Sequence, residues 1–151
     1  MHENEKWMKI ALEEAECAAS EGEIPVGAVI VDGAGNLLAR AHNLCETHQM
    51  PTDHAEMLAV EAACKSNNSW RLSDCTAYVT LEPCPMCMGA MIHARVKRIV
   101  FGTPDPRAGA CGSLIDFSAY PMESSPEILG GVLAEECIEP IRRFFKSARK
   151  K

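Results

Sequence analysis

The chain has 151 residues, 47% of them hydrophobic, and a formal net charge of −6. This length suits a single domain, 1–151, which would bury roughly 70% of the surface that its unfolded chain exposes. Such a domain needs no disulfide or structural metal to remain folded. The longest apolar run, 24–31, is too short to cross a bilayer, which excludes membrane insertion, and the negative charge argues mildly against a nucleic-acid partner.

The first predicted element is a helix that begins near Asn4, which can cap it, and ends at Gly22. Its apolar residues recur at helical spacing: Trp7, Ile10, Ala11, Ala15 and Ala18. A strand hairpin follows, with strands at 25–31 and 37–42 joined by the glycine-bearing loop 32–36.

Two further buried strands are predicted at 75–81 and 98–102, with helices at about 53–66 and 84–94. Strands that alternate with helices of this length indicate an α/β sandwich in which helices cover the sheet. The remaining segments are a Pro/Gly-rich loop at 101–113, a short segment at 114–117, an irregular segment at 120–126 and a last helix at 131–148. Pro140 interrupts the backbone hydrogen bonds of that helix, so we expect a kink or restart near Glu139.

Eight cysteines raise the question of disulfides, but the first ten residues lack the apolar core and cleavage site of a signal peptide. We therefore expect a reducing, cytoplasmic compartment, in which paired cysteines more often bind metal. The eight are Cys17, Cys45, Cys64, Cys75, Cys84, Cys87, Cys111 and Cys137.

The strongest chemical signal is the pair Cys84 and Cys87, in the stretch "PCPMC". Three positions apart on a helix, the two thiols share one face, and Pro83 or Pro85 suits the first turn of that helix. Thiolates at a helix N-terminus are also stabilised by the helix dipole. The pair supplies half of a zinc site.

The other half is expected in "PTDHAE", where His54 is a ligand type suited to zinc. His54 and Glu56 are two positions apart, which fits the start of a helix better than its middle, with Thr52 or Asp53 as the cap. A structural site would need a fourth ligand, for which only Cys111, His42 and His93 are candidates without ligand spacing, and it would not need Glu56. A free carboxylate beside a three-ligand zinc favours metal-assisted hydrolysis.

These motifs resemble the zinc-dependent nucleobase deaminases, whose H-x-E…P-C-x-x-C signature reads here "HAE" and "PCPMC". The resemblance extends over roughly 6–150, and successive segments of the chain look like those of the bacterial tRNA-specific adenosine deaminases. It rests on the segments "EIPVGAVIV", "ARAHN", "PTDHAE", "WRL", "YVTLEPCPMCMGAMIHAR", "RIVFGTPDPRAGACGSL" and "GVLAEECIEPIRRFFKSAR".

The resemblance implies a three-layer α/β/α cytidine-deaminase-like fold with a mixed five-stranded sheet. It implies deamination of adenosine to inosine at the wobble position of a tRNA anticodon by a homodimer. His54, Cys84 and Cys87 would hold one Zn²⁺ per chain, and Glu56 would move protons from the attacking water to the ring and to the departing ammonia. The target base must leave its stack to enter such a pocket, which an anticodon loop permits.

The resemblance also implies substrate contacts. Asn43 would hydrogen-bond the flipped nucleotide, and Val26 and Leu81 would wall the pocket. Asp105 would contact RNA beside the target. Each has a plainer interpretation: Asn43 as a loop cap, Val26 and Leu81 as core residues, and Asp105 as a turn former.

The last ten residues hold six of the fifteen lysines and arginines and no acidic residue. The preceding 141 residues therefore carry nine basic and 21 acidic residues, a net charge of −12. The basic residues of this tail are Arg142, Arg143, Lys146, Arg149, Lys150 and Lys151. Together with Phe144 and Phe145 they are candidates for contacts with the RNA backbone and bases. A solvated helix end with two phenylalanines in the core is the alternative.

Three functions remain open from the sequence. The first is a tRNA adenosine deaminase. The second is a deaminase of a free base or nucleoside, of the guanine or cytosine type, which is favoured by the acidic body and by Asp53, where the family usually has alanine. The third is a catalytically silent zinc module, against which the complete set of His54, Glu56, Cys84 and Cys87 argues.

Overall fold

The structure is a computed structural model that describes residues 2–117 and 124–149, so Lys150, Lys151 and part of the predicted irregular segment lie outside it. Its elements are α1 (His2–Ser20), β1 (Gly27–Val31), β2 (Leu37–His42), α2 (Cys45–His48), α3 (Ala55–Asn67), β3 (Thr76–Leu81), α4 (Pro85–His93), β4 (Arg98–Thr103), β5 (Glu127–Leu129) and α5 (Ala134–Arg149). No helix in these ranges is long and apolar enough to span a membrane.

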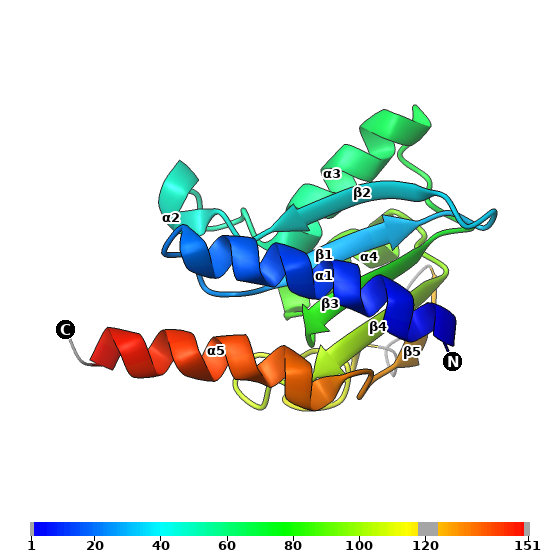
Figure 1. Cartoon of the computed structure of the whole chain (residues 1–151). Helices are drawn as coiled ribbons and strands as arrows, with labels where there is room; N and C mark the ends of the chain where they lie inside the picture. The colour runs from blue at the N-terminus through cyan, green and yellow to red at the C-terminus, as the bar shows by residue number, and fades with distance from the viewer. Residues whose placement is uncertain (1, 118–123, 150–151) are drawn as a thin grey trace.

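The five strands form one mixed sheet in the order β2-β1-β3-β4-β5. β1 is antiparallel to both of its neighbours, whereas β3, β4 and β5 are parallel to one another. α1 and α5 cover one face and α3 and α4 cover the other (Figure 1). The predicted three-layer α/β/α fold with a mixed five-stranded sheet is therefore confirmed.

The inner strand β1 is buried along its whole length because both faces of the sheet are covered. Ala28 and Ile30 belong to the core under α3 and α4, while Val29 and Val31 belong to the core under α1. At Gly27, a Cβ atom would lie 1.9 Å from the backbone oxygen of Ala11. The glycine therefore lets α1 pack directly against the sheet.

Three predicted features of the helix ends are corrected by the structure. Asn4 lies inside α1, and its side chain accepts hydrogen bonds from Tyr78 Oη (3.1 Å) and Arg98 Nη2 (2.5 Å) instead of capping the helix. α5 begins at Ala134, after Gly131 and Leu133 have taken positive φ angles. It then continues through the buried Pro140 without a restart.

The structure also contains two elements that the sequence patterns did not predict, the single turn α2 and the short edge strand β5. The segment 114–117 joins no sheet strand, and Asp116 forms an isolated bridge with Cys111. α2 and the loops after β3 and β4 lie at one end of the sheet, where α3 begins (Figure 1).

Candidate metal centre and substrate pocket

Three ligand atoms meet at this end of the sheet, one from His54 and two from cysteines that lie 30 and 33 positions further along the chain. His54 Nδ1 lies 3.6 Å from Cys84 Sγ and 3.5 Å from Cys87 Sγ. A tetrahedral zinc with its usual bond lengths would separate a nitrogen and a sulfur ligand by about 3.5–3.6 Å. The three predicted ligands therefore fit zinc in both chemistry and spacing.

Two helix N-termini converge on this point. His54 is the residue immediately before α3, and Cys84 is the residue immediately before α4, with Pro85 in the first turn of α4 as predicted. The positive end of each helix dipole therefore lies beside the ligands, and neither N-terminus is capped by a side chain. Asp53 does not cap α3, contrary to expectation, because its carboxylate binds His48 Nδ1 at 2.7 Å.

The two thiols are coupled electrostatically. A hydrogen bond from Cys87, opposed by burial and assisted by His54, lowers the pKa of the Cys84 thiol to about 4. The same hydrogen bond raises the pKa of Cys87, and burial adds to that shift. One thiolate is thus favoured before any metal binds, and a cation is the natural replacement for the shared proton.

Among the described residues, this trio is the one group with the spacing of a metal site, and none of the three candidates for a fourth ligand joins it. Cys111 Sγ contacts Met88 Sδ at 3.4 Å, His42 binds Glu14 and Glu21, and His93 is exposed at the end of α4. A tetrahedral ion here would have an open position, which is characteristic of catalytic zinc sites.

Glu56 lies in the first turn of α3 and lines the same pocket without being one of the clustered ligands. It is 6% exposed. Burial is the main reason that the pKa of its carboxyl is raised above the ordinary value, and Cys84 contributes in the same direction. A buried carboxyl of raised pKa beside an open metal position has the properties of a general acid and base.

The pocket has a volume of about 140 Å³ and is lined by residues from five stretches of the chain, 24–26, 43, 54–56, 81–84 and 105–108. The predicted contacts Val26, Asn43, Leu81 and Asp105 all line it. Asn43 is buried, donates its backbone N–H to the Val26 oxygen at 3.2 Å and accepts a hydrogen bond from Cys45 Sγ at 3.1 Å through Oδ1. The prediction missed four further lining residues, Ile24, Ala55, Glu82 and Ala108. The first three lie in or beside the predicted motifs, whereas Ala108 carries no signal of its own.

Phe144 and Phe145 do not line this pocket but border two grooves beside it. Phe145 borders a groove that shares Leu81 and Asp105 with the pocket, and both rings border a second groove that shares Asn43 and His54 with it. The two rings pack edge to face with their centroids 5.4 Å apart, and Phe145 is 37% exposed. The predicted alternative of two phenylalanines docked in the core is therefore wrong for Phe145.

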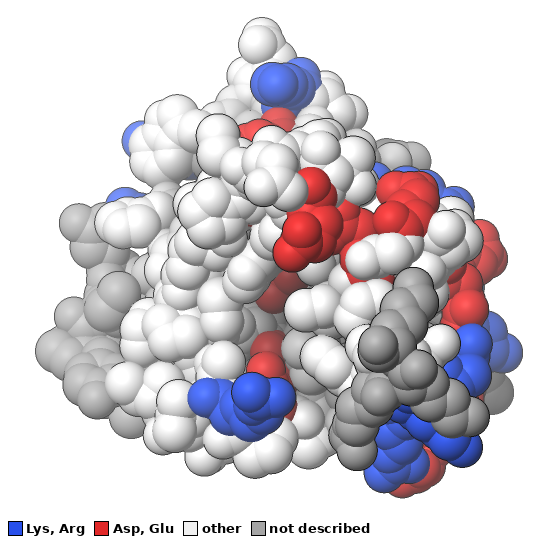
Figure 2. Space-filling model, turned by 90° about the vertical axis from the view of Figure 1, so that its left-hand side faces the viewer, with Lys and Arg blue, Asp and Glu red and all other residues white. Residues whose placement is uncertain are grey.

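The surface around this end of the molecule has a divided charge. Figure 2 shows acidic side chains gathered above and to the right of the centre, and basic side chains at the lower edge with a smaller basic group at the top. Part of the basic tail is neutralised within the chain, since Arg143 donates to Glu16 at 2.7 Å and Arg142 lies 3.8 Å from Glu135.

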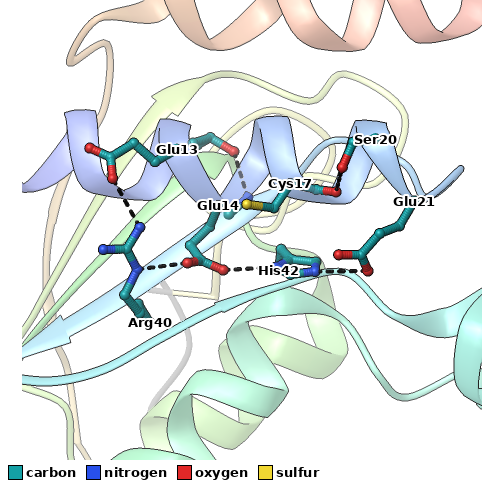
Figure 3. A network of polar contacts seen from close by, with 9 residues as sticks. Glu13, Glu14, Cys17, Ser20, Glu21, Arg40 and His42 are labelled. Atoms are coloured by element: carbon teal, nitrogen blue, oxygen red, sulfur yellow. Dashed lines mark hydrogen bonds and ion pairs between the residues drawn. The ribbon is translucent and has the colours of Figure 1, made fainter.

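A polar network joins β2 to α1 directly before Asn43 (Figure 3). Glu14 lies between Arg40 (2.6 Å) and His42 (2.7 Å), and His42 also reaches Glu21 at 3.2 Å. Burial disfavours the charged imidazole, but the hydrogen bonds to Glu14 and Glu21 outweigh it and raise the pKa of His42. The network fixes the end of β2 from which Asn43 enters the pocket.

Comparison with known proteins places these features in a family. The model of the MafB19-like deaminases matches residues 2–135. The chain is 47% identical to a tRNA-specific adenosine deaminase of Bacillus subtilis (strain 168) over 152 aligned residues, which cover 100% of this chain and 94% of that protein.

Two solved structures extend the comparison. One comes from studies of A-to-I editing by tRNA:A34 deaminases at the wobble position of transfer RNA. It matches with a TM-score of 0.86 at 36% identity, over 89% of this chain and 98% of that one. A guanine deaminase from Nitrosomonas europaea matches with a TM-score of 0.78 at 23% identity, over 93% and 83% of the two chains, and shares the fold alone.

Proposed function

Because this chain belongs to the MafB19-like deaminases and to the tRNA-specific adenosine deaminases, we propose that it converts adenosine to inosine at the wobble position of a tRNA anticodon by zinc-dependent hydrolysis. One observation carries the chemistry: three ligands spaced for zinc, with a buried carboxyl in the same pocket that is not one of them. The free-base alternative has weaker support, because the likeness to guanine deaminase reaches only the fold. A silent zinc module would have no use for Glu56.

In this proposal His54, Cys84 and Cys87 hold one zinc ion per chain. When bound, zinc supplies a water whose pKa falls to about 7 and which acts as the nucleophile toward C6 of the purine. Glu56 would take one proton of the attacking water and deliver it to the ring nitrogen. It would then take the proton of the hydroxyl newly bound to C6 and pass it to the amino group, which leaves as ammonia. Burial raises the pKa of the Glu56 carboxyl, which makes its carboxylate a stronger base toward the protons of the attacking water.

The pocket residues orient the base. Asn43 presents a buried amide to the flipped nucleotide, while the side chains of Val26 and Leu81 lie against the faces of the base. The nucleotides on either side extend into the two grooves that Phe145 borders, one of which contains Asp105. Aromatic side chains at such positions stack on unpaired bases at about 1–3 kcal/mol for each base.

The family resemblance further suggests a homodimer, and we propose the cytoplasm as the compartment of the enzyme because the proposed substrate is tRNA. Light scattering coupled to size-exclusion chromatography tests the first point. A molar mass equal to that of one 16.5 kDa chain would contradict it.

One experiment tests the function. The purified protein is incubated separately with deacylated tRNA, with free adenosine, and with guanine and cytosine, and the inosine, ammonia and product masses are measured. We expect inosine in the anticodon of the tRNA and little turnover of the small substrates. Rapid turnover of a free base with unmodified tRNA would establish the alternative.

A further inference from the structure

Glu82 is a buried carboxylate in the pocket wall for which the proposed chemistry has no use. It is 2% exposed and lies two residues before the ligand Cys84. Its oxygens accept from the backbone N–H groups of Asp105 (3.0 Å), Cys111 (2.8 Å) and Ser113 (3.2 Å), and from the Ser113 hydroxyl. Every one of these donors belongs to the loop that follows β4.

Backbone hydrogen bonds also join the segment 81–84 to β4 and the loop that follows it. Ala110 donates its N–H to the Pro83 oxygen at 2.8 Å, and Glu82 donates its own N–H to the Thr103 oxygen at 2.9 Å. The turn contributes Leu81 and Cys84 to the pocket, and the loop contributes Asp105 and Ala108. Glu82 thus lies between the two halves of one pocket wall.

The loop approaches Glu82 so closely that a side chain would not fit between them. A Cβ atom on Gly109 would lie 2.3 Å from the carboxyl carbon of Glu82 and 2.4 Å from its Oε2. The backbone of Gly109 is not in the left-handed region, so its φ angle does not exclude alanine. The obstacles are the Glu82 carboxylate and the backbone oxygen of Asp105, which would lie 2.6 Å from the added Cβ. Position 109 is therefore closed by the group that binds the loop and by the loop itself.

We infer that Glu82 is a positioning residue, whose carboxylate fixes Asp105 and Ala108 relative to the metal-holding Cys84. The inference rests on the proposed function for its catalytic consequence, but the hydrogen-bonded tie itself does not. A carboxylate is needed because four donors point at it and it has no proton to oppose them. Misplacement of a pocket wall by about 1 Å is enough to cost up to ~100-fold in rate.

The test is Glu82→Gln, which keeps the size of the side chain. The Ser113 hydroxyl can turn to accept a hydrogen bond, so the new NH₂ group settles toward it and leaves the Asp105 N–H without an acceptor. We expect the Asp105 amide to exchange with solvent at least ~10-fold faster in hydrogen-exchange measurements. We expect kcat to fall at least ~10-fold. KM for tRNA should stay within about threefold, because phosphate contacts outside the pocket dominate RNA affinity.

The matched control is Asp32→Asn. Asp32 also accepts two backbone N–H bonds and one side-chain bond, from Ala34, Asn36 and Asn36 Nδ2, but it does so in the hairpin turn after β1, at the other end of the strand from the pocket residue Val26. The control should lose thermal stability without loss of kcat when both variants are assayed well below their melting temperatures. Equal kcat values for the two variants would overturn the inference.

Gly109→Ala displaces the loop while keeping the carboxylate, and it serves if Glu82→Gln fails to fold. It should reproduce the faster Asp105 exchange and the lower kcat, and the double variant should lose little more than the worse single variant. An unchanged exchange rate at Asp105 in Glu82→Gln would refute the tie. Faster exchange with unchanged kcat would refute the positioning role. If the parent protein deaminates a nucleoside and not tRNA, the proposed function fails. The kcat of Glu82→Gln is then measured with that nucleoside, which still tests the positioning role.

Discussion

His54 Nδ1 lies 3.6 Å from Cys84 Sγ, although 30 residues separate them in the chain. Each stands immediately before a helix, so two helix N-termini and a depressed thiol pKa act on one point. The site is arranged to accept a cation whose charge replaces the proton of the thiol pair, and its properties lead to measurable expectations.

Freshly purified protein should contain one tightly bound zinc per chain, because three ligands of this kind form a high-affinity site. Metal analysis checks the stoichiometry. Removal of the metal with a chelator should abolish deamination, and added zinc should restore it. A content well under about half an equivalent, or full activity with iron, would be incompatible with this assignment.

Glu56→Gln should keep the fold and the zinc but lose at least ~100-fold in kcat, since it removes the proton carrier and no ligand. Single-turnover rates on tRNA, with metal content measured in parallel, check this. The paired control is Asp53→Ala, which removes the contact with His48 and no residue of the pocket wall. The control should be near neutral. Near-parental activity in Glu56→Gln would reassign the proton carrier.

His42 should make the stability of the protein depend on pH. Since its pKa is raised in the folded state, its contribution is fully present below the unfolded value of about 6.5 and is lost as the pH rises through the folded value. His42→Asn should therefore destabilise the protein more at pH 6 than at pH 8. The free energy of unfolding at pH 6 should fall by about 0.5–1 kcal/mol, within the range for partly exposed ion pairs. Urea unfolding at both pH values checks it, and an equal loss at both would contradict it.

Truncation after Phe145 should leave a folded, zinc-loaded protein with little activity on tRNA, because it deletes Lys146, Arg149, Lys150 and Lys151 but keeps both phenylalanines. The remaining basic residues Arg142 and Arg143 are paired with Glu135 and Glu16, so they replace the lost phosphate contacts poorly. The salt dependence of RNA binding should flatten, since fewer phosphate contacts release fewer counterions. An unchanged slope and activity would show that RNA binds elsewhere.

The long apolar strands, the four longer helices and the ligand set were predictable because their signals are local. β1, β3 and β4 are continuous apolar runs, and the spacing of Cys84 and Cys87 is read directly from the sequence. α2 was not predictable, because its first N–H groups are satisfied by the buried carboxylate of Glu23, more than 20 residues earlier.

Other misses have the same physical origin. β5 has only three residues, two of them exposed, and is defined by its pairing with β4. Glu82 resembles any residue of a strand end until the loop after β4 folds onto it. Asn4 looks like a helix cap until Tyr78 and Arg98 reach it from the sheet. Each depends on a partner distant in sequence, which local patterns do not contain.

The pocket is assembled from five separate stretches of chain, from Ile24 to Ala108, which meet only when β1 has inserted between β2 and β3. The three ligands all lie within 54–87, but they meet only when α3 and α4 have packed against each other on the sheet, so we expect metal capture on the late side of the folding barrier. Zinc should accordingly slow unfolding while leaving the refolding rate nearly unchanged, apart from weak binding by the two cysteines in the unfolded chain. The metal would then stabilise the folded protein kinetically, by lowering its unfolding rate. Stopped-flow unfolding with and without zinc would measure the ratio of the two unfolding rates.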